Sequence, residues 1–187
     1  NRGAGTPSLL QKLGKELGFV VEVLPPVQLD ETIVSSTVVR QALEEGDIGR
    51  ARSYLGYWPS LEGRVVLGDQ RGGKKMGFPT ANLDISQDVL IPARGVYVAQ
   101  VKVGDQIYDG VVNIGVKPTI GPDLPPTVEV HILEFAQVIY GEWVQLSLLH
   151  RLRSEKRFSS VTELVSQIKR DIEAARTLRT SARFSQA

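Results

Sequence analysis

The stretch GVYVAQVKV, from Gly95 to Val103, decides the fold of this chain. Its residues divide into two alternating sets, Tyr97, Ala99, Val101 and Val103 in one and Val96, Val98, Gln100 and Lys102 in the other. A period of two residues is that of a β-strand, because successive side chains of a strand point to opposite faces. Gly104-Asp105 follows as a tight turn, so we predict that residues 106–114 return antiparallel to this strand.

Two further segments, residues 127–135 and 143–149, continue the series of short strands. Strands at this spacing, separated by turn residues, favour a small closed antiparallel barrel that leaves few edges exposed. The segment Ser160-Val161-Thr162-Glu163 is a capping box for a helix. Beyond it, one apolar stripe at helical spacing comprises Val161, Leu164, Val165, Ile168, Ile172 and Ala175. We predict a mainly β fold with this helix packed on the barrel and a frayed end over residues 179–187.

The first sixty residues follow a pattern typical of an α/β region. Leucines at helical spacing predict a helix from Ser8 to Gly18, and residues 19–24 form a compact apolar strand closed by two prolines. Two more helices are predicted over residues 35–46 and 47–56. A single strand cannot pair its edges, so the series indicates the end part of a Rossmann-like domain. We place the domain boundary within residues 57–60, which gives domains 1–58 and 59–187.

The composition excludes several classes of function. The chain has 22 basic and 21 acidic residues, and a net charge of +1 argues against a general nucleic-acid-binding surface. It has no cysteine, which excludes disulfides, thiolate nucleophiles and cysteine-ligated metals, and its two histidines lie too far apart for a zinc-binding pattern. It contains neither a long apolar run nor a signal-peptide pattern, so we expect a cytoplasmic protein that binds no membrane.

The segment RGGKKMGFPTAN, residues 71–82, has the residue types of a phosphate and magnesium site. Its glycines allow consecutive N–H groups to turn toward an anion, and its basic side chains add positive charge. In an extended segment the Thr80 hydroxyl and the Asn82 amide oxygen point to the same side, and Mg²⁺ accepts such hard oxygen ligands. The residues predicted to bind phosphate are Arg71, Gly72, Gly73, Lys74, Gly77, Pro79 and Thr80.

Two other interpretations of this segment have to be weighed. Residues 68–75 are one residue short of a Walker A loop, with Lys75 in place of the magnesium-binding hydroxyl. A helix must open directly after the lysine of such a loop, and Gly77 and Pro79 would break it, so we reject this match. A glycine-rich turn with solvated lysines is the second interpretation, which the glycines and lysines alone leave open.

Glu129 lies on a predicted strand with two different faces. Val128, Val130 and Ile132 point one way, so Glu129 and His131 point to the side opposite the aliphatic residues. Alternation alone favours an exposed strand glutamate without a catalytic role. His131 either orients a neighbour or is solvated, and we assign no chemistry to it or to His150.

Three more segments have both a structural and a functional interpretation. Residues 113–119 can be a turn that leaves a strand, and residues 153–158 can be the entry to a helix. The set Ser35, Ser36, Thr37 and Arg40 starts a helix. Hydroxyls there either cap the helix alone or join its free N–H groups in binding a nucleotide phosphate.

Four strings in order along the chain resemble the riboflavin kinase (flavokinase) module of bacterial bifunctional riboflavin kinase/FAD synthetases. They are GFPTAN at 77–82, NIGVKPT at 113–119, EVH at 129–131 and RSEKRF at 153–158. The resemblance covers residues 61–178 and implies a six-stranded Greek-key barrel. Upstream, VSSTVVR at 34–40 is similar to a late nucleotidyltransferase motif of the same enzymes, which binds ATP phosphates while FMN is adenylylated.

The resemblance also implies roles for individual residues. Glu129 would act on the ribityl 5′-hydroxyl as the catalytic carboxylate, and Mg²⁺ would be held by Thr80 and Asn82. Residues 153–158 would form a flap over the flavin, and the residues predicted to bind flavin are Asn113, Arg153, Glu155 and Phe158. The residues predicted to remain from the adenylyltransferase are Ser35, Ser36, Thr37 and Arg40.

We therefore expect an ATP- and Mg²⁺-dependent riboflavin kinase that makes FMN and ADP. The H-x-G-H signature of the adenylyltransferase occurs nowhere in the 187 residues, so we expect this chain to begin inside that domain and to lack its activity. A flavin- or nucleotide-binding regulatory module without turnover is the alternative, and a partner-binding barrel without nucleotide is a third possibility. The sequence predicts no oligomeric state.

Overall fold

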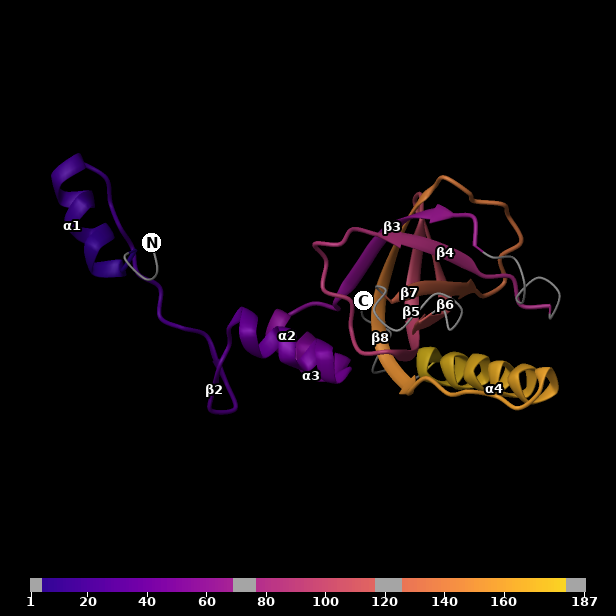
Figure 1. The fold of residues 1–187 in the computed structure, drawn as a ribbon. Helices are drawn as coiled ribbons and strands as arrows, with labels where there is room; N and C mark the ends of the chain where they lie inside the picture. Colours follow the sequence, from indigo (N-terminus) through magenta and orange to yellow (C-terminus); the bar gives the residue numbers. More distant parts are fainter. Residues whose placement is uncertain (1–4, 69–76, 117–125, 181–187) are drawn as a thin grey trace. The chain divides into compact units, whose positions relative to one another are not determined.

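The computed structural model describes residues 5–68, 77–116 and 126–180. The chain divides into two compact units, residues 1–34 and 35–187 (Figure 1). Within these described ranges, the first unit contains one helix and a minimal hairpin, whereas the second contains two helices, a six-stranded barrel and a long final helix.

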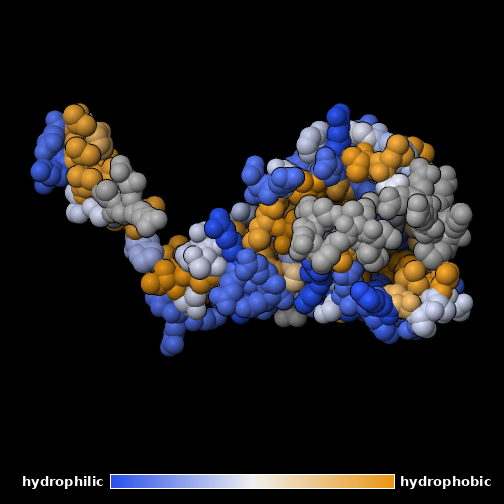
Figure 2. All heavy atoms as spheres, in the orientation of Figure 1, coloured by the Kyte–Doolittle hydropathy of each residue, from blue (hydrophilic) through white to orange (hydrophobic). Residues whose placement is uncertain are grey.

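In the first unit, helix α1 (Pro7–Leu17) confirms the first predicted helix. The Thr6 side chain accepts a hydrogen bond from the backbone of Leu9 at its start, and Gly18 ends it in the left-handed conformation at φ 78°. Its polar and apolar sides are visible in Figure 2. The hairpin that follows joins β1 (Gln28–Leu29) to β2 (Thr32–Ile33).

The strand predicted over residues 19–24 is wrong. These residues belong to no strand, and Val20 is 96% exposed. A β-strand needs a neighbour to pair its N–H and C=O groups, and the described part of this unit pairs only residues 28–29 with 32–33. Local apolar composition therefore did not suffice to make a strand.

The second unit begins with helices α2 (Ser36–Glu45) and α3 (Ile48–Leu55), which confirm the two predicted there. Gly46, at φ 76°, ends α2, and the Asp47 side chain caps α3. Ile48 is buried in the main core of the barrel, and the Ala93 N–H donates to the Leu43 carbonyl at 2.9 Å. Both helices thus pack with the barrel, while the division into domains 1–58 and 59–187 stays a prediction.

The predicted closed antiparallel barrel is confirmed. Around the barrel the strands follow the order β3-β4-β7-β6-β5-β8, and every pair is antiparallel. The spatial order β8-β5-β6-β7 is that of a Greek key. The strands are β3 (Ser60–Val66), β4 (Ala81–Ile85), β5 (Gly95–Val103), β6 (Gln106–Gly115), β7 (Thr127–Ile132) and β8 (Trp143–Arg153).

The alternation that predicted β5 and β6 places one face of each in the barrel core. Tyr97, Ala99 and Val101 of β5 meet the inward side chains of the other strands there. The hairpin turn after Val103 is formed by Gly104 and Asp105, and β6 pairs with β5 along the whole length of β5. Burial of these apolar side chains, at about 25 cal/mol per Å², is the main stabilising term of such a barrel.

Helix α4 (Val161–Thr180) lies along the outside of the barrel (Figure 1). Ala175 packs there against Val98 of β5 and Leu149 of β8. Its buried residues, including Ile172, all lie in its second half, and Val161 at the start of the predicted stripe is exposed. The predicted packing is thus confirmed, with full burial of the stripe confined to the second half of the helix and Leu164, Val165 and Ile168 half-buried. Within the described ranges, no helix is long and apolar enough to cross a membrane.

Candidate active site

The outer face of the barrel carries a row of polar residues from three adjacent strands. Glu129 of β7 lies opposite Asn82 of β4 on one side and opposite Asn113 of β6 on the other. Each is half-buried and is followed along its strand by a buried core residue. Directly opposed residues of antiparallel strands have Cβ atoms about 5 Å apart, so the Glu129 carboxyl can reach both amides.

This row unites three residues that come from separate segments of the sequence. Asn82 is a predicted metal ligand, Glu129 the predicted catalytic carboxylate, and Asn113 a predicted flavin contact. The alternating burial along β7 also confirms that Glu129 faces away from the aliphatic side of its strand. A carboxylate between two amides offers hard oxygen ligands and hydrogen-bonding groups over a short distance, as a site for a divalent cation and a hydroxyl requires.

Two glycines make room for side chains of the site. A Cβ atom on Gly68 would lie 2.2 Å from the Asn82 amide nitrogen, so the chain beyond β3 passes directly against that amide. A Cβ atom on Gly115 would lie 2.4 Å from a carboxylate oxygen of Glu155. Glu155 therefore lies over Gly115 at the end of β6, and Gly115 is two residues along the chain from Asn113. The end of β8 and the polar row thus meet at the end of β6.

The turn before β4 leads into the site. Gly77 has φ 82°, a left-handed conformation that glycine adopts without strain, and Phe78 is half-buried behind it. Pro79 and Thr80 are exposed and come directly before β4. Four residues predicted to bind phosphate, Arg71, Gly72, Gly73 and Lys74, lie outside the described residues, as do Lys117, Pro118 and Thr119 of the motif at 113–119.

His131 connects this turn to the strand of Glu129. Its Nδ1 atom lies 2.8 Å from the Pro79 carbonyl oxygen, and its ring meets that of Phe78 edge to face with centroids 5.8 Å apart. The sequence leaves two interpretations for His131, and these contacts agree with the one in which it orients a neighbour. Its position two residues after Glu129, on the same strand face, was the only sequence signal for this contact.

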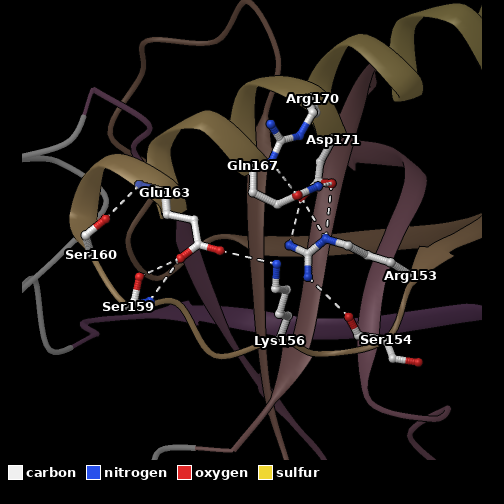
Figure 3. A network of polar contacts seen from close by, with 9 residues as sticks. All are labelled: Arg153, Ser154, Lys156, Ser159, Ser160, Glu163, Gln167, Arg170 and Asp171. Carbon is white, nitrogen blue, oxygen red and sulfur yellow. Dashed lines mark hydrogen bonds and ion pairs between the residues drawn. The ribbon is translucent and has the colours of Figure 1, made fainter.

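The segment predicted as a flap, residues 153–158, leads from the end of β8 toward α4. Figure 3 shows the guanidinium of Arg153 turned toward Asp171 of α4. Arg153 Nε and Nη2 donate to the Asp171 carboxylate at 2.8–3.2 Å, and its guanidinium also lies 5.7 Å from the Phe158 ring centre. Two predicted flavin contacts, Arg153 and Phe158, are therefore together, and they contact each other.

Asp171 is a residue that the sequence analysis did not select. It is 5% exposed and accepts a further hydrogen bond from Gln167 Nε2 at 2.8 Å. The sequence signal for a buried ion pair at this residue was its place directly beside Ile172 of the apolar stripe, because a charged side chain is buried there only when it is paired.

A second set of contacts holds the other end of the segment. Glu163 accepts hydrogen bonds from the backbone N–H and hydroxyl of Ser159 at 3.1 and 2.9 Å, and from Lys156 Nζ at 3.2 Å (Figure 3). The Ser159 backbone N–H, then its hydroxyl and Lys156, hold the pKa of Glu163 below its ordinary value of 4.5. The predicted capping box is half realised, because Ser160 Oγ accepts from the Glu163 N–H while the Glu163 carboxylate returns to Ser159.

The residues predicted to remain from an adenylyltransferase, Ser35, Ser36, Thr37 and Arg40, are all exposed at the start of α2. Ser35 occupies the N-cap position, but its side chain makes no capping hydrogen bond. The Ser35 side chain therefore does not cap the helix, which was one of the two roles that the sequence left open. Phosphate binding by these residues stays a prediction.

A cavity of about 620 Å³ lies elsewhere, between the α2–α3 turn and β8. Its lining includes Asp47, Arg52, Trp58, His150 and Arg151, with the Arg52 guanidinium 4.0 Å from the centre of the Trp58 ring. None of its described lining residues is a predicted site residue. It belongs to the packing of the two helices on β8.

Comparison with known proteins identifies the family of this chain. The riboflavin kinase family, also called flavokinase, matches residues 55–179. This chain belongs to the riboflavin kinase family. The range contains the whole barrel, the polar row and most of α4, so the family resemblance expected from the motifs is confirmed.

Among relatives, the bifunctional riboflavin kinase/FMN adenylyltransferase of Escherichia coli K12 is 41% identical over 169 residues, which are 90% of this chain and 53% of that protein. That of Haemophilus influenzae is 38% identical over 173 residues, 92% of this chain and 55% of that protein. This riboflavin kinase-family chain thus spans about half the length of the curated relatives it matches. The solved structure of the riboflavin kinase from Trypanosoma brucei matches with a TM-score of 0.55 at 26% identity. The match covers 70% of this chain and 83% of the Trypanosoma brucei chain.

Proposed function

We propose that this chain transfers the γ-phosphoryl group of ATP to the 5′-hydroxyl of riboflavin, giving FMN and ADP. The observation that carries the proposal is the row in which Glu129 lies between Asn82 and Asn113. In this proposal Glu129 is the base, Asn82 belongs to the metal side and Asn113 to the flavin side of one outer face. Membership of the riboflavin kinase family supports the same reaction.

Glu129 acts on the attacking hydroxyl in this proposal. Phosphoryl transfer passes through a loose transition state, so the main work of a carboxylate is to orient the hydroxyl and to accept its proton late. Glu129 is half-buried on a strand paired on both sides, which fixes its backbone and gives that orientation a rigid support.

Mg²⁺ fits the oxygen donors at one end of the row. The Asn82 amide and the Thr80 hydroxyl would hold it, and the described residues offer no cluster of three or more acidic or histidine side chains as an alternative metal site. Bound there with ATP, the cation neutralises charge that develops on the phosphate oxygens. The turn at 77–80 and the basic segment before it would bind the nucleotide, and Asn113 with the segment at 153–158 would bind the flavin.

We also propose that residues 1–58 derive from the adenylyltransferase part of such bifunctional enzymes. The names of the relatives that match 90% or more of this chain include FMN adenylyltransferase, and the matched length exceeds the kinase domain.

The test is to incubate the protein with riboflavin and Mg-ATP and to measure FMN by chromatography. In the Glu129→Gln variant, which is nearly isosteric, turnover should fall about 10²–10⁴-fold, the typical contribution of a general base. Riboflavin binding, followed by its fluorescence, should change little. Glu62→Gln is the matched control, because Glu62 is exposed on β3 of the same barrel.

Absence of FMN with the unaltered protein would reject the proposed function. If Glu129→Gln keeps normal turnover but loses riboflavin affinity, Glu129 is a binding residue instead. A protein that binds riboflavin and Mg-ADP and forms no FMN would be the regulatory module that the sequence left as an alternative.

A further inference from the structure

In the part of the chain that the structure describes, the turn at 77–80 that leads into the site takes no part in the pairing of β4 with β7. The first pair between β4 and β7 is Ala81 with Val130, and pairing continues from there toward Asn82 and Glu129. Before Ala81, Pro79 has no N–H with which to extend the ladder. The backbone of the turn therefore needs another contact to bring it to β7.

The His131 side chain makes that contact. His131 directly follows Val130 of that pair, and its Nδ1 atom lies 2.8 Å from the carbonyl oxygen of Pro79, two residues before Ala81. Because a carbonyl oxygen can only accept, Nδ1 carries the proton and donates. The ring edge also packs against Phe78, at an interplanar angle of 86°. One side chain thus holds the two residues that precede Thr80.

We infer that His131 is a positioning residue for the nucleotide and metal side of the site, acting through the Pro79 carbonyl on the placement of Thr80. The inference rests on the proposed kinase function. Thr80 is exposed and lies outside β4, so its hydroxyl takes its position from the turn. Asn82 and Glu129 lie within paired strands, whose backbone hydrogen bonds do not depend on this histidine.

The inference predicts an asymmetric defect. Loss of the Nδ1–H donor should weaken Mg-nucleotide binding, whereas the flavin side, built from β6 and the end of β8, should keep its affinity. One hydrogen bond corresponds to about 3- to 10-fold in affinity, so changes of that size are expected in the KM for Mg-ATP and in the Kd for Mg-ADP.

Three variants of the full chain test the role of the donor itself. The amide nitrogen of Asn is three bonds from Cα, as Nδ1 of His is, whereas that of Gln is four bonds away, as Nε2 is. We expect His131→Asn to stay within about 2-fold of the unaltered protein, and His131→Gln and His131→Leu to weaken Mg-ADP about 3- to 10-fold. His150→Leu and His150→Asn are matched controls, because His150 is exposed on β8.

The measurements are the KM values for Mg-ATP and riboflavin, calorimetric binding of Mg-ADP, and the thermal midpoint. Equal Mg-ADP affinity in all three His131 variants would overturn the inference. An equal loss of Mg-ADP affinity in His131→Asn and His131→Leu would also overturn it, because the effect would then come from the ring and not from the donor. So would parallel increases in the KM values for Mg-ATP and riboflavin, which would indicate a general loosening of the site. If the unaltered protein forms no FMN, the proposed function fails and this inference fails with it; FMN formation with unchanged variants rejects the inference alone.

Discussion

Replacing Asp171 by Asn should destabilise the second unit by removing one partner of a buried ion pair. The Asp171 and Arg153 side chains are 7% and 22% exposed, and the carboxylate accepts from two nitrogens of Arg153 and from Gln167. Asn keeps the shape but turns an NH₂ group toward donors, which leaves the guanidinium without a counter-charge.

The magnitude follows from this geometry. Breaking a fully buried pair from one side costs about 3–5 kcal/mol. Arg153 keeps some solvent contact and its hydrogen bond to the Ser154 carbonyl at 3.2 Å, which lowers the penalty. We therefore expect a loss of about 2–3 kcal/mol in the free energy of unfolding, a large part of the roughly 5–15 kcal/mol of a typical domain.

Urea unfolding followed by circular dichroism measures this loss. A double-mutant cycle with Arg153→Met separates the pair from other effects, and the double variant should lose less than the sum of the two single variants. Glu173→Gln is the matched control on the same helix, because the Glu173–Arg176 pair is 69% and 51% exposed and should be worth less than about 1 kcal/mol.

A loss below about 0.5 kcal/mol for Asp171→Asn, or a coupling energy near zero with Arg153, would refute the reasoning. It would mean that the pair exists in the structure without holding the segment after β8 to α4.

Three other predictions follow from particular residues. Thr80→Val and Asn82→Leu should leave the barrel folded by circular dichroism but weaken Mg-ADP binding in calorimetry, and normal kinase activity in both would contradict the metal assignment. The lowered pKa of Glu163 contributes a stabilisation that is fully present above pH 4.5 and is lost as the pH falls through the folded-state pKa of this group, and Glu163→Gln should remove it. Urea midpoints of the unaltered protein and the variant that differ by the same amount at every pH would contradict this prediction. A polypeptide of these 187 residues contains no H-x-G-H, and the loss of one phosphate-stabilising donor of that kind lowers the rate about 10²–10³-fold, so it should form no FAD from FMN and Mg-ATP. FAD synthesis that co-purifies with the polypeptide would contradict this prediction.

The local elements were predictable because their signals are local. Alternation along residues 95–103 and the turn at Gly104-Asp105 were enough for the hairpin of β5 and β6. Capping residues and terminal glycines were enough for α1, α2 and α3. The prediction for residues 19–24 failed for the complementary reason, because a strand depends on a neighbour that no local pattern reports.

The sequence by itself determined which residue types could do chemistry. It pointed to Asn82, Glu129 and Asn113 and to the family that joins them, through motifs that are short and local. Only the tertiary structure decided that the three form one row, because β7 pairs on one side with β6, the strand before it, and on the other side with β4, which lies three strands earlier in the chain. The same holds for His131 with Pro79 and for Arg153 with Asp171, whose contacts span 52 and 18 residues of sequence. Such contacts depend on strand register and on where a helix docks, and no periodicity within one element encodes either.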